Sequence, residues 1–168
     1  MSGTDMLTMK GKYGIKALIH LARLSSDEMQ QSSAIAEANG IPKKFLDTIL
    51  SELRNAGLIH TRKGRSGGYQ LRVPAENISV AQILRILDGP ISPISCVSKT
   101  AYQKCFDCRN QTTCEIRLLM LDVRDAMLEI LEHRTLRDLS NSGALAQHVL
   151  SMGGPEGLGG GETAAQAG

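Results

Sequence analysis

The sequence contains no tryptophan and, among its 168 residues, only two phenylalanines and three tyrosines. A buried core must therefore be built mainly from Leu, Ile, Val, Ala and Met. No stretch approaches the roughly 18 consecutive apolar residues of a membrane-spanning helix. The N-terminal MSGTDMLTMKGKYG also lacks the apolar region of a secretory signal peptide. We therefore expect a cytoplasmic protein with no membrane partner.

Two motifs that carry common enzymatic chemistry are absent as well. The chain has no phosphate-binding P-loop and no H-E-x-x-H zinc motif. His20 lies in a predicted helix, His60 in a predicted strand and His133 near the end of a long helix, where packing or surface roles are expected. We therefore expect a protein that is not an enzyme and has no small-molecule substrate.

Cysteine is missing from most of the chain, because all four cysteines lie within residues 96–114. Cys96, Cys105, Cys108 and Cys114 have the spacing C-x8-C-x2-C-x5-C. In a reducing cytoplasm, clustered thiols indicate metal, cluster or redox chemistry more often than structural disulfides. Zinc sites usually combine two short Cys pairs, whereas this segment has only Cys105 and Cys108 close together. The irregular spacing favours an iron–sulfur cluster, 4Fe–4S or 2Fe–2S, and leaves zinc, a thiol redox switch and unliganded cysteines as alternatives.

Hydrophobic periodicity predicts the order of the secondary-structure elements. A helix over 9–24 is followed by a short helix that Ser33 caps and that ends before Gly40. Pro42 then suits the first turn of a helix that runs to Asn55. Period-two patterns predict strands at 58–61 and 69–73, and the Ser79–Gln82 capping pattern predicts a helix over 80–88. A loop with no period covers 91–114, a long helix begins near Thr113, and Thr135 caps a final turn.

This order of elements is typical of a winged helix-turn-helix, a DNA-binding unit. The second helix of the pair would place its exposed N-terminal residues, Lys43, Lys44, Asp47 and Thr48, against base edges. Basic side chains concentrate on the hairpin tip at Arg62, Lys63 and Arg65, and no acidic residue lies between positions 53 and 75. Asp47 repels phosphate but can accept a hydrogen bond from cytosine, so it is either a readout residue or an ordinary surface carboxylate.

The long helix carries an apolar seam at intervals of four and three residues, which is typical of helix pairing. The seam consists of Ile116, Met120, Val123, Met127 and Ile130. Leu118, Leu121 and Leu128 are expected to form a second apolar face that packs on the same chain. Since so short a chain has little mass to cover both faces, the seam predicts a homodimer.

The predicted fold is therefore mainly α with a small β-hairpin, and the chain divides into four parts. These are a winged helix-turn-helix domain at 1–90, a cysteine-rich loop at 91–114, a dimerisation helix with its closing turn at 115–140, and a tail at 141–168. The tail contains eight glycines and no Lys or Arg. This composition predicts a disordered segment.

Several stretches together resemble the Rrf2 family of winged-helix regulators, of the IscR, NsrR and RirA type. They are MLTMKGKYGIKAL, GIPKKFLDTILSELRNAGLIHTRKGRSGGYQL, ISVAQILRILDGP and the closing TLRDL. The resemblance covers about residues 6–140 and is most specific at 53–71. It implies a dimeric transcription factor, usually a repressor, that reads the half-sites of a near-palindromic operator in double-stranded DNA. The DNA contacts it implies are Lys44, Phe45, Asp47 and Thr48, with Lys63 at the wing tip.

The resemblance also implies a ligand set for an iron–sulfur cluster. Cys96, Cys108 and Cys114 match the three cysteines of the family, and Cys105 is additional. Other members take a fourth ligand from a carboxylate or a histidine, at positions that are Lys12 and Arg117 here. Both departures favour Cys105 as the fourth ligand. We therefore expect a DNA-binding regulator controlled by a cluster, with a thiol- or zinc-switched regulator or a redox or cluster-carrier protein as alternatives.

Overall fold

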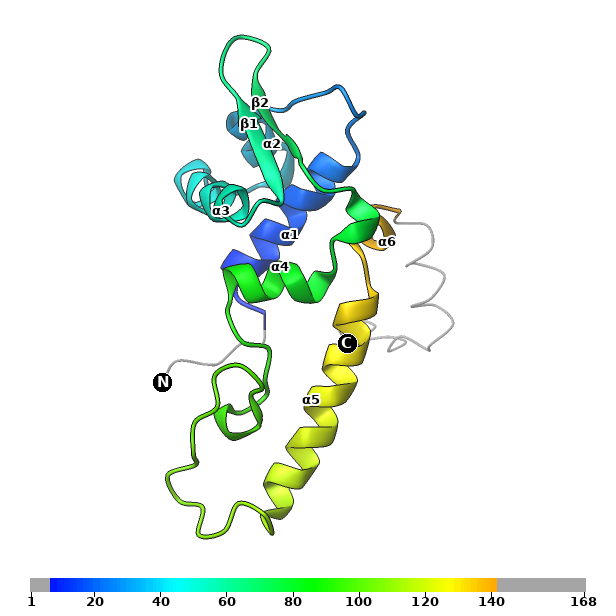
Figure 1. Ribbon diagram of the computed structural model, residues 1–168. Helices are drawn as coiled ribbons and strands as arrows, with labels where there is room; N and C mark the ends of the chain where they lie inside the picture. Colours follow the sequence, from blue (N-terminus) through cyan, green and yellow to red (C-terminus); the bar gives the residue numbers. More distant parts are fainter. Residues whose placement is uncertain (1–6, 142–168) are drawn as a thin grey trace, which may run out of the picture.

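The structure is a computed structural model that describes residues 7–141. The expectation of a disordered tail therefore falls, apart from Asn141, outside the described residues. The described part confirms the predicted fold class, because it is mainly helical with one two-stranded antiparallel hairpin. Figure 1 shows a helical head with the hairpin at one end and a single long helix, α5, extending from the other.

The head consists of α1 (Met9–Ala22), α2 (Ser32–Asn39), α3 (Lys43–Asn55), α4 (Val80–Leu87) and α6 (Leu136–Ser140). Their apolar faces meet in one core, as the helical periodicity predicted. Its fully buried side chains include Leu18, Ile35, Leu46, Ile49, Leu53, Ile78, Ile83 and Leu136. The core supports α3 and the hairpin from one side and leaves their other surfaces exposed.

The turn between α2 and α3 depends on a glycine in the left-handed conformation. Gly40 has φ of 62° and ends α2, and the N–H of Ile41 donates to the carbonyl of Ala36 at 2.9 Å. A side chain at Gly40 would be strained at this φ. The prediction that Ser33 caps α2 is wrong, because α2 begins at Ser32 and its N-cap is Gln31, which makes no side-chain cap. Pro42 is the N-cap of α3, next to the first-turn position predicted for it.

The hairpin pairs β1 (Ile59–Arg62) with β2 (Gly68–Leu71), in a register that joins Ile59 to Leu71 and Arg62 to Gly68. A single antiparallel bridge between Gln30 and Tyr69 places a third segment of the polypeptide beside the outer edge of β2. Hydrogen bonds of 3.0 and 2.8 Å link these two residues in both directions. The bridge ties β2 of the hairpin to the segment before α2.

Helices α1 and α4 cross closely because α1 carries two glycines on the shared face. A Cβ added at Gly14 would lie 2.1 Å from Leu87 Cδ1, and one at Gly11 would lie 2.2 Å from Asp88 Oδ2. The vacated space lets Asp88 cap the start of α1, where it accepts hydrogen bonds from the Thr8 N–H at 3.2 Å and from the Thr8 hydroxyl at 2.5 Å.

A short turn, η1 (Ala75–Asn77), precedes α4, and the cysteine-rich loop that follows α4 has one regular turn, η2 (Ser95–Val97). The loop leads into α5 (Glu115–His133), whose N-cap is Cys114, so the helix begins two residues later than the predicted Thr113. Thr135 and Asp138 form the predicted cap of α6 as a complete capping box. The strand-like contact between Ser79 and Thr135 attaches the end of α5 to the start of α4.

Candidate functional site

The exposed side of α3 presents the polar residues that the sequence placed there. Lys43, Lys44 and Thr48 are exposed, and Asp47 is half-exposed beside Lys43. The Lys43 ammonium donates to Asp47 Oδ2 at 2.8 Å. This hydrogen bond is the main cause of the lowered pKa of Asp47, with a smaller effect from Ser32. The carboxylate is therefore charged and oriented along the helix, while the Thr48 hydroxyl donates back to the Lys44 carbonyl at 3.3 Å.

The Phe45 side chain lies at the boundary between the buried and the exposed sides of α3. Its side chain is 37% exposed. Its ring meets the ring of Tyr13 edge to face, with the centroids 5.7 Å apart and the planes at 80°. Such pairs are favourable by about 0.5–1.5 kcal/mol beyond burial. Phe45 is therefore a partly exposed apolar residue at the α1–α3 junction, accessible from the surface that carries Lys44.

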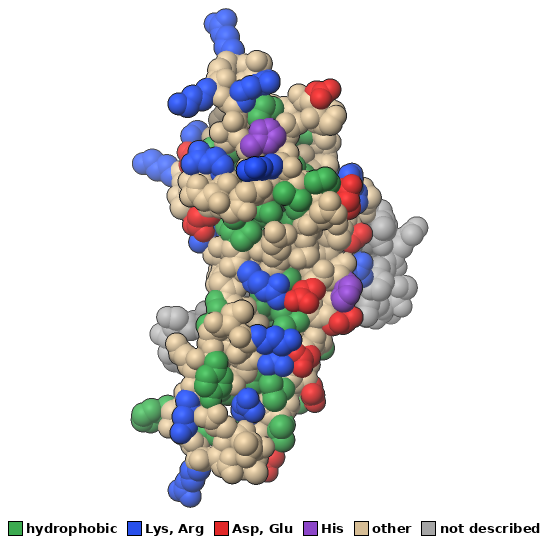
Figure 2. All heavy atoms as spheres, in the orientation of Figure 1, with side chains coloured by type: hydrophobic (Ala, Val, Ile, Leu, Met, Phe, Trp, Pro, Cys, Tyr) green, Lys and Arg blue, Asp and Glu red, His purple; other side chains and the backbone are tan. Residues whose placement is uncertain are grey.

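The hairpin tip presents a group of exposed cations. Arg62, Lys63 and Arg65 are all exposed, and Figure 2 shows Lys and Arg side chains projecting from this end of the molecule. Gly64 has φ of 115°, and a Cβ added at Gly67 would lie 2.1 Å from the Arg62 carbonyl oxygen. The glycines thus allow a narrow tip whose side chains all point outward, a shape that suits entry into a DNA groove.

The tip also spells G-x-S-x-G, from Gly64 to Gly68, a pattern that marks a nucleophilic serine when it joins a strand to a helix. Here the pattern joins two antiparallel strands instead. The local structure that exposes and activates a serine in hydrolases is therefore not formed at Ser66.

The cysteine loop brings two of its thiols, Cys96 and Cys105, into contact. Cys96, which is only 3% exposed, has its Sγ 3.9 Å from that of Cys105. The hydrogen bond with Cys96 is the main cause that raises the pKa of Cys105. The pKa of Cys108 is raised by partial desolvation and by its hydrogen bond with Cys114. All four cysteines are free thiols.

The four predicted ligands are thus on one loop but not in one closed site. Within residues 7–141, no three His, Cys, Asp or Glu side chains converge closely enough to hold a metal ion. The donor set still fits a thiophilic group by its chemistry, since soft thiolates prefer iron–sulfur clusters, zinc or copper(I). On binding such a group the thiols would become thiolates and release their protons to solvent.

Two arginines on the inner side of α5 hold the backbone of this loop. Arg117 Nε donates to the Cys96 carbonyl at 3.2 Å, and an Arg124 NH group donates to the Val97 carbonyl at 2.7 Å. The Arg124 side chain is only 12% exposed. Sequence reasoning missed these contacts, although a seven-residue interval between arginines places both on one face of a helix. Lys12 stands at the position where some family members are expected to have a carboxylate ligand, and it is exposed on α1.

The predicted seam of α5 is uncovered in the single chain. Ile116 is 67% exposed, Val123 37% and Ile130 61%, while Met120 and Met127 are half-buried. Leu128 packs inward at 6% exposed, as predicted. The inclusion of Leu118 in that inward face is wrong, because its side chain is 50% exposed. Arg117 and Arg124 share the inward side of α5 with Leu128.

None of the helices within residues 7–141 has both the length and the apolar character that crossing a lipid bilayer requires.

Comparison with protein families matches residues 7–142 to Rrf2, described as an iron-dependent transcriptional regulator. A Rhodobacter capsulatus protein named as an Rrf2-like HTH-type transcriptional regulator is 39% identical, over 86% of this chain and 99% of its own length. The solved structure of CymR, the global cysteine regulator of Bacillus subtilis, covers 81% of this chain and 96% of its own, at 32% identity and a TM-score of 0.68. The structure of IscR from T. potens covers 86% and 92%, at 26% identity and a TM-score of 0.65.

Proposed function

Because this chain belongs to the Rrf2 family of transcriptional regulators, as its sequence motifs predicted, we propose that it is a homodimeric repressor whose DNA affinity depends on an iron–sulfur cluster. The observation that carries the proposal is the arrangement of the cysteine loop. Four free thiols occupy a single loop, and α5 holds that loop through Arg117 and Arg124. A change at the thiols therefore has a direct mechanical connection to the helix that would join two subunits.

DNA would be bound through α3 and the wing. The exposed N-terminal half of α3 has the diameter to enter the major groove, where Lys43, Lys44 and Thr48 would meet bases or phosphates. The cations at 62, 63 and 65 would contact the adjacent backbone or minor groove. Such a protein would work in the cytoplasm, where its DNA is. A homodimer presents two of these units, so the operator would be near-palindromic.

The dimer would form along the uncovered seam of α5. Three large apolar side chains, Ile116, Val123 and Ile130, stand on one line of the helix and are each more than a third exposed. Soluble proteins bury such a continuous apolar stripe against a partner, and a second copy of the same helix supplies a matching one.

Cys96, Cys105, Cys108 and Cys114 would hold the cluster, which when bound supplies a centre sensitive to oxygen, nitric oxide and iron shortage. Loss of the ligated state would leave free thiols on a loop whose turn at η2 remains tied to α5. The spacing of the two DNA-binding heads would change through the start of α5, where Cys114 is the N-cap.

Anaerobic purification of the full chain tests this proposal. The expected product is coloured and contains iron and acid-labile sulfide, and Cys105→Ser should lose both more rapidly on exposure to air. Ser95→Ala, a change of similar size on the same loop, is the matched control and should retain them. A colourless protein that carries stoichiometric zinc would falsify the cluster.

A thiol switch is the second candidate, and the 3.9 Å separation of the Cys96 and Cys105 sulfurs favours it. Two thiols at this distance need only a small approach to form a disulfide. Hydrogen peroxide would take two electrons and two protons from the pair and leave as water. Peptide mass spectrometry of the oxidised protein would then show a Cys96–Cys105 cross-link. A DNA-binding assay on the same sample would show lowered affinity, and dithiothreitol would reverse both changes.

A further inference from the structure

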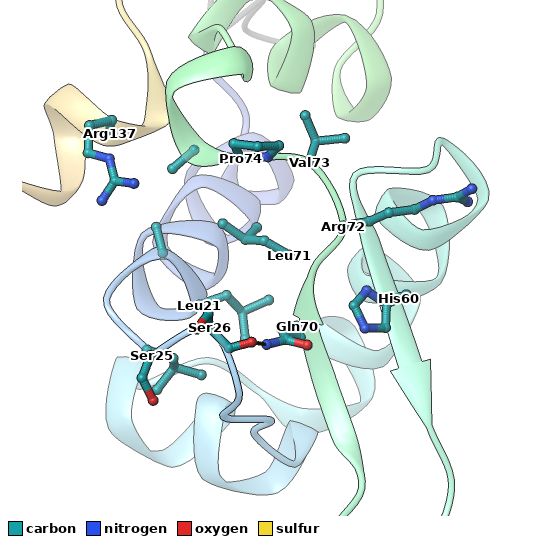
Figure 3. A pocket seen from close by; sticks show the side chains of 13 residues that line it. Leu21, Ser25, Ser26, His60, Gln70, Leu71, Arg72, Val73, Pro74 and Arg137 are labelled. Carbon is teal, nitrogen blue, oxygen red and sulfur yellow. Dashed lines mark hydrogen bonds between the residues drawn. The ribbon is translucent and has the colours of Figure 1, made fainter.

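A hollow of about 450 Å³ lies between the end of α1, the outer edge of β2, η1 and α6 (Figure 3). Its volume is within the range of small-molecule sites in proteins. It is separate from the cysteine loop and from the tip of the wing. We propose that this hollow binds a small organic dianion, such as a dicarboxylate with an apolar middle.

The charged side chains that line the hollow are cationic. Arg72, Arg137 and His60 line it, and the lining contains no Asp or Glu. Arg137 forms an exposed ion pair of 3.0 Å with Glu76, which lies outside the lining. Within residues 7–141, the Arg72 guanidinium forms no ion pair or side-chain hydrogen bond. Figure 3 shows Arg137 on the α6 side and Arg72 on the hairpin side, where the Arg72 side chain extends away from Leu71 and would have to turn back to meet a ligand in the hollow.

The edge of β2 adds an open hydrogen-bonding pair at the same place. The Arg72 N–H donates to the Leu58 carbonyl at 2.9 Å, so the main-chain groups of Arg72 point toward β1. Those of Tyr69 point the other way, to Gln30. In the alternation of a strand, the N–H and C=O of Leu71 therefore also point outward, into the hollow. No backbone hydrogen bond from another described segment reaches them.

The ligand class follows from these groups together. A guanidinium binds a carboxylate through charge-assisted hydrogen bonds, and the Leu71 N–H supplies a further donor. Leu24, Leu71 and Val73 are half-buried apolar residues of the lining, so the middle of the ligand should be apolar. Cations on both sides of this apolar strip favour a molecule with an anionic group at each end over inorganic phosphate.

Amide NMR of the full chain tests the site without DNA and without reference to the cluster, so its failure would leave the proposed function untouched. Glutarate is the probe, and glutaramide is its neutral counterpart. We expect saturable shifts of the amides of residues 71–73 with glutarate and none with glutaramide. Arg72→Gln or Arg137→Gln should each raise the dissociation constant for glutarate about tenfold, the effect of losing one charge-assisted hydrogen bond.

Arg85→Gln is the matched control, because Arg85, like Arg137, forms an exposed ion pair with a glutamate of a neighbouring element, Glu132. It should bind glutarate as the wild type does. The proposal is overturned if glutarate produces no saturable shift, or if all three arginine variants respond alike. Inorganic phosphate that saturates the same amides with equal affinity would overturn the organic dianion as the ligand class.

Discussion

Arg124 of α5 donates a hydrogen bond of 2.7 Å to the main-chain carbonyl of Val97, from a side chain that is only 12% exposed. The residue joins the long helix to the turn that carries Cys96. It also pairs with the neighbouring Asp125 at 2.8 Å, and this interaction is the main cause of the lowered pKa of Asp125. The loop is thus attached to α5 at a defined point rather than lying freely beside it.

Replacing Arg124 with alanine should release the η2 turn. A hydrogen bond from a charged donor contributes about 1.5–3 kcal/mol, so local opening should become at least about tenfold more frequent. Hydrogen exchange of the Val97 and Ser98 amides, which donate to Ile94 and Ser95, measures this opening. Asp125→Asn keeps the bond to Val97 and is the control. Equal exchange in all three proteins would show that the bond does not hold the turn.

Gly14→Ala should destabilise the head by about 1–3 kcal/mol, the usual cost of overpacking a well-packed core. The added Cβ would stand 2.1 Å from Leu87 Cδ1, so α1 and α4 must move apart. Chemical denaturation measures the loss. Leu87→Ala removes the clashing atoms, and the double variant should therefore be more stable than the sum of the two single changes predicts. If the destabilisations of the two single variants simply add in the double variant, the loss of stability does not come from the contact between the added Cβ at position 14 and Leu87.

The cap of α6 predicts a dependence of stability on pH. The Asp138 carboxylate accepts from the Thr135 N–H and hydroxyl, both at 2.8 Å, and these bonds lower the pKa of Asp138 in the folded state. Its stabilising effect is therefore present above the unfolded pKa of about 3.9 and is lost as pH falls through the lower folded pKa. Since the group is near the surface, we expect only about 0.5 kcal/mol.

Asp138→Asn keeps the shape of the cap and removes its ionisation. The difference in unfolding free energy between wild type and this variant should be constant near neutral pH and shrink in acid. Thr135→Val removes one of the two donors and should give a smaller pH dependence. A difference that persists unchanged in acid would contradict the assignment.

Val123→Glu should convert the proposed homodimer to a monomer. It places a charge in the middle of the uncovered seam, where burial against a partner would leave it unpaired. Light scattering coupled to size-exclusion chromatography gives the mass directly. Leu118→Glu is the matched control, since Leu118 is 50% exposed, more than Val123 at 37%, but lies on another side of α5. A dimer that survives Val123→Glu and is lost with Leu118→Glu would place the interface on the wrong face.

Lys63→Ala and Arg65→Ala should weaken operator binding and flatten its dependence on salt. Each phosphate contact that is lost should lower the slope of log K against log salt by about 0.9. Fluorescence anisotropy over a range of salt concentrations measures it. Lys99→Ala, which removes an exposed lysine of the cysteine loop, should leave the slope unchanged. A slope that is the same in all four proteins would mean that the wing does not touch the DNA backbone.

Local patterns were enough to predict most of the fold. The helices of the head, the hairpin and the cap at Thr135 each depend on residues that are close in sequence, so periodicity and capping rules identify them. The error on α5 arises where a tertiary contact overrides the local pattern. Leu118 looked like a core residue, but Leu128 shares the inward side of α5 with Arg117 and Arg124, whose guanidinium groups meet main-chain carbonyls.

The candidate sites were predictable to different degrees for the same reason. Exposed cations on α3 and the wing follow from the sequence once the helix-turn-helix order is recognised. The contact between Cys96 and Cys105 does not follow from the sequence, because a loop without a period gives no rule for which thiols meet. The hollow beside β2 combines α1, the hairpin and α6, so no single stretch of sequence could reveal it.

The bonds from Thr8 to Asp88 have a practical consequence for anyone who purifies this protein. They fix the start of α1 against the end of α4, where the chain leaves for the cysteine loop. A histidine tag on the amino-terminal side of Thr8 therefore joins the described fold beside the start of that loop. Histidine tags bind metal ions and can exchange them with nearby thiols. Metal analyses should accordingly be made on protein from which any such tag has been cleaved.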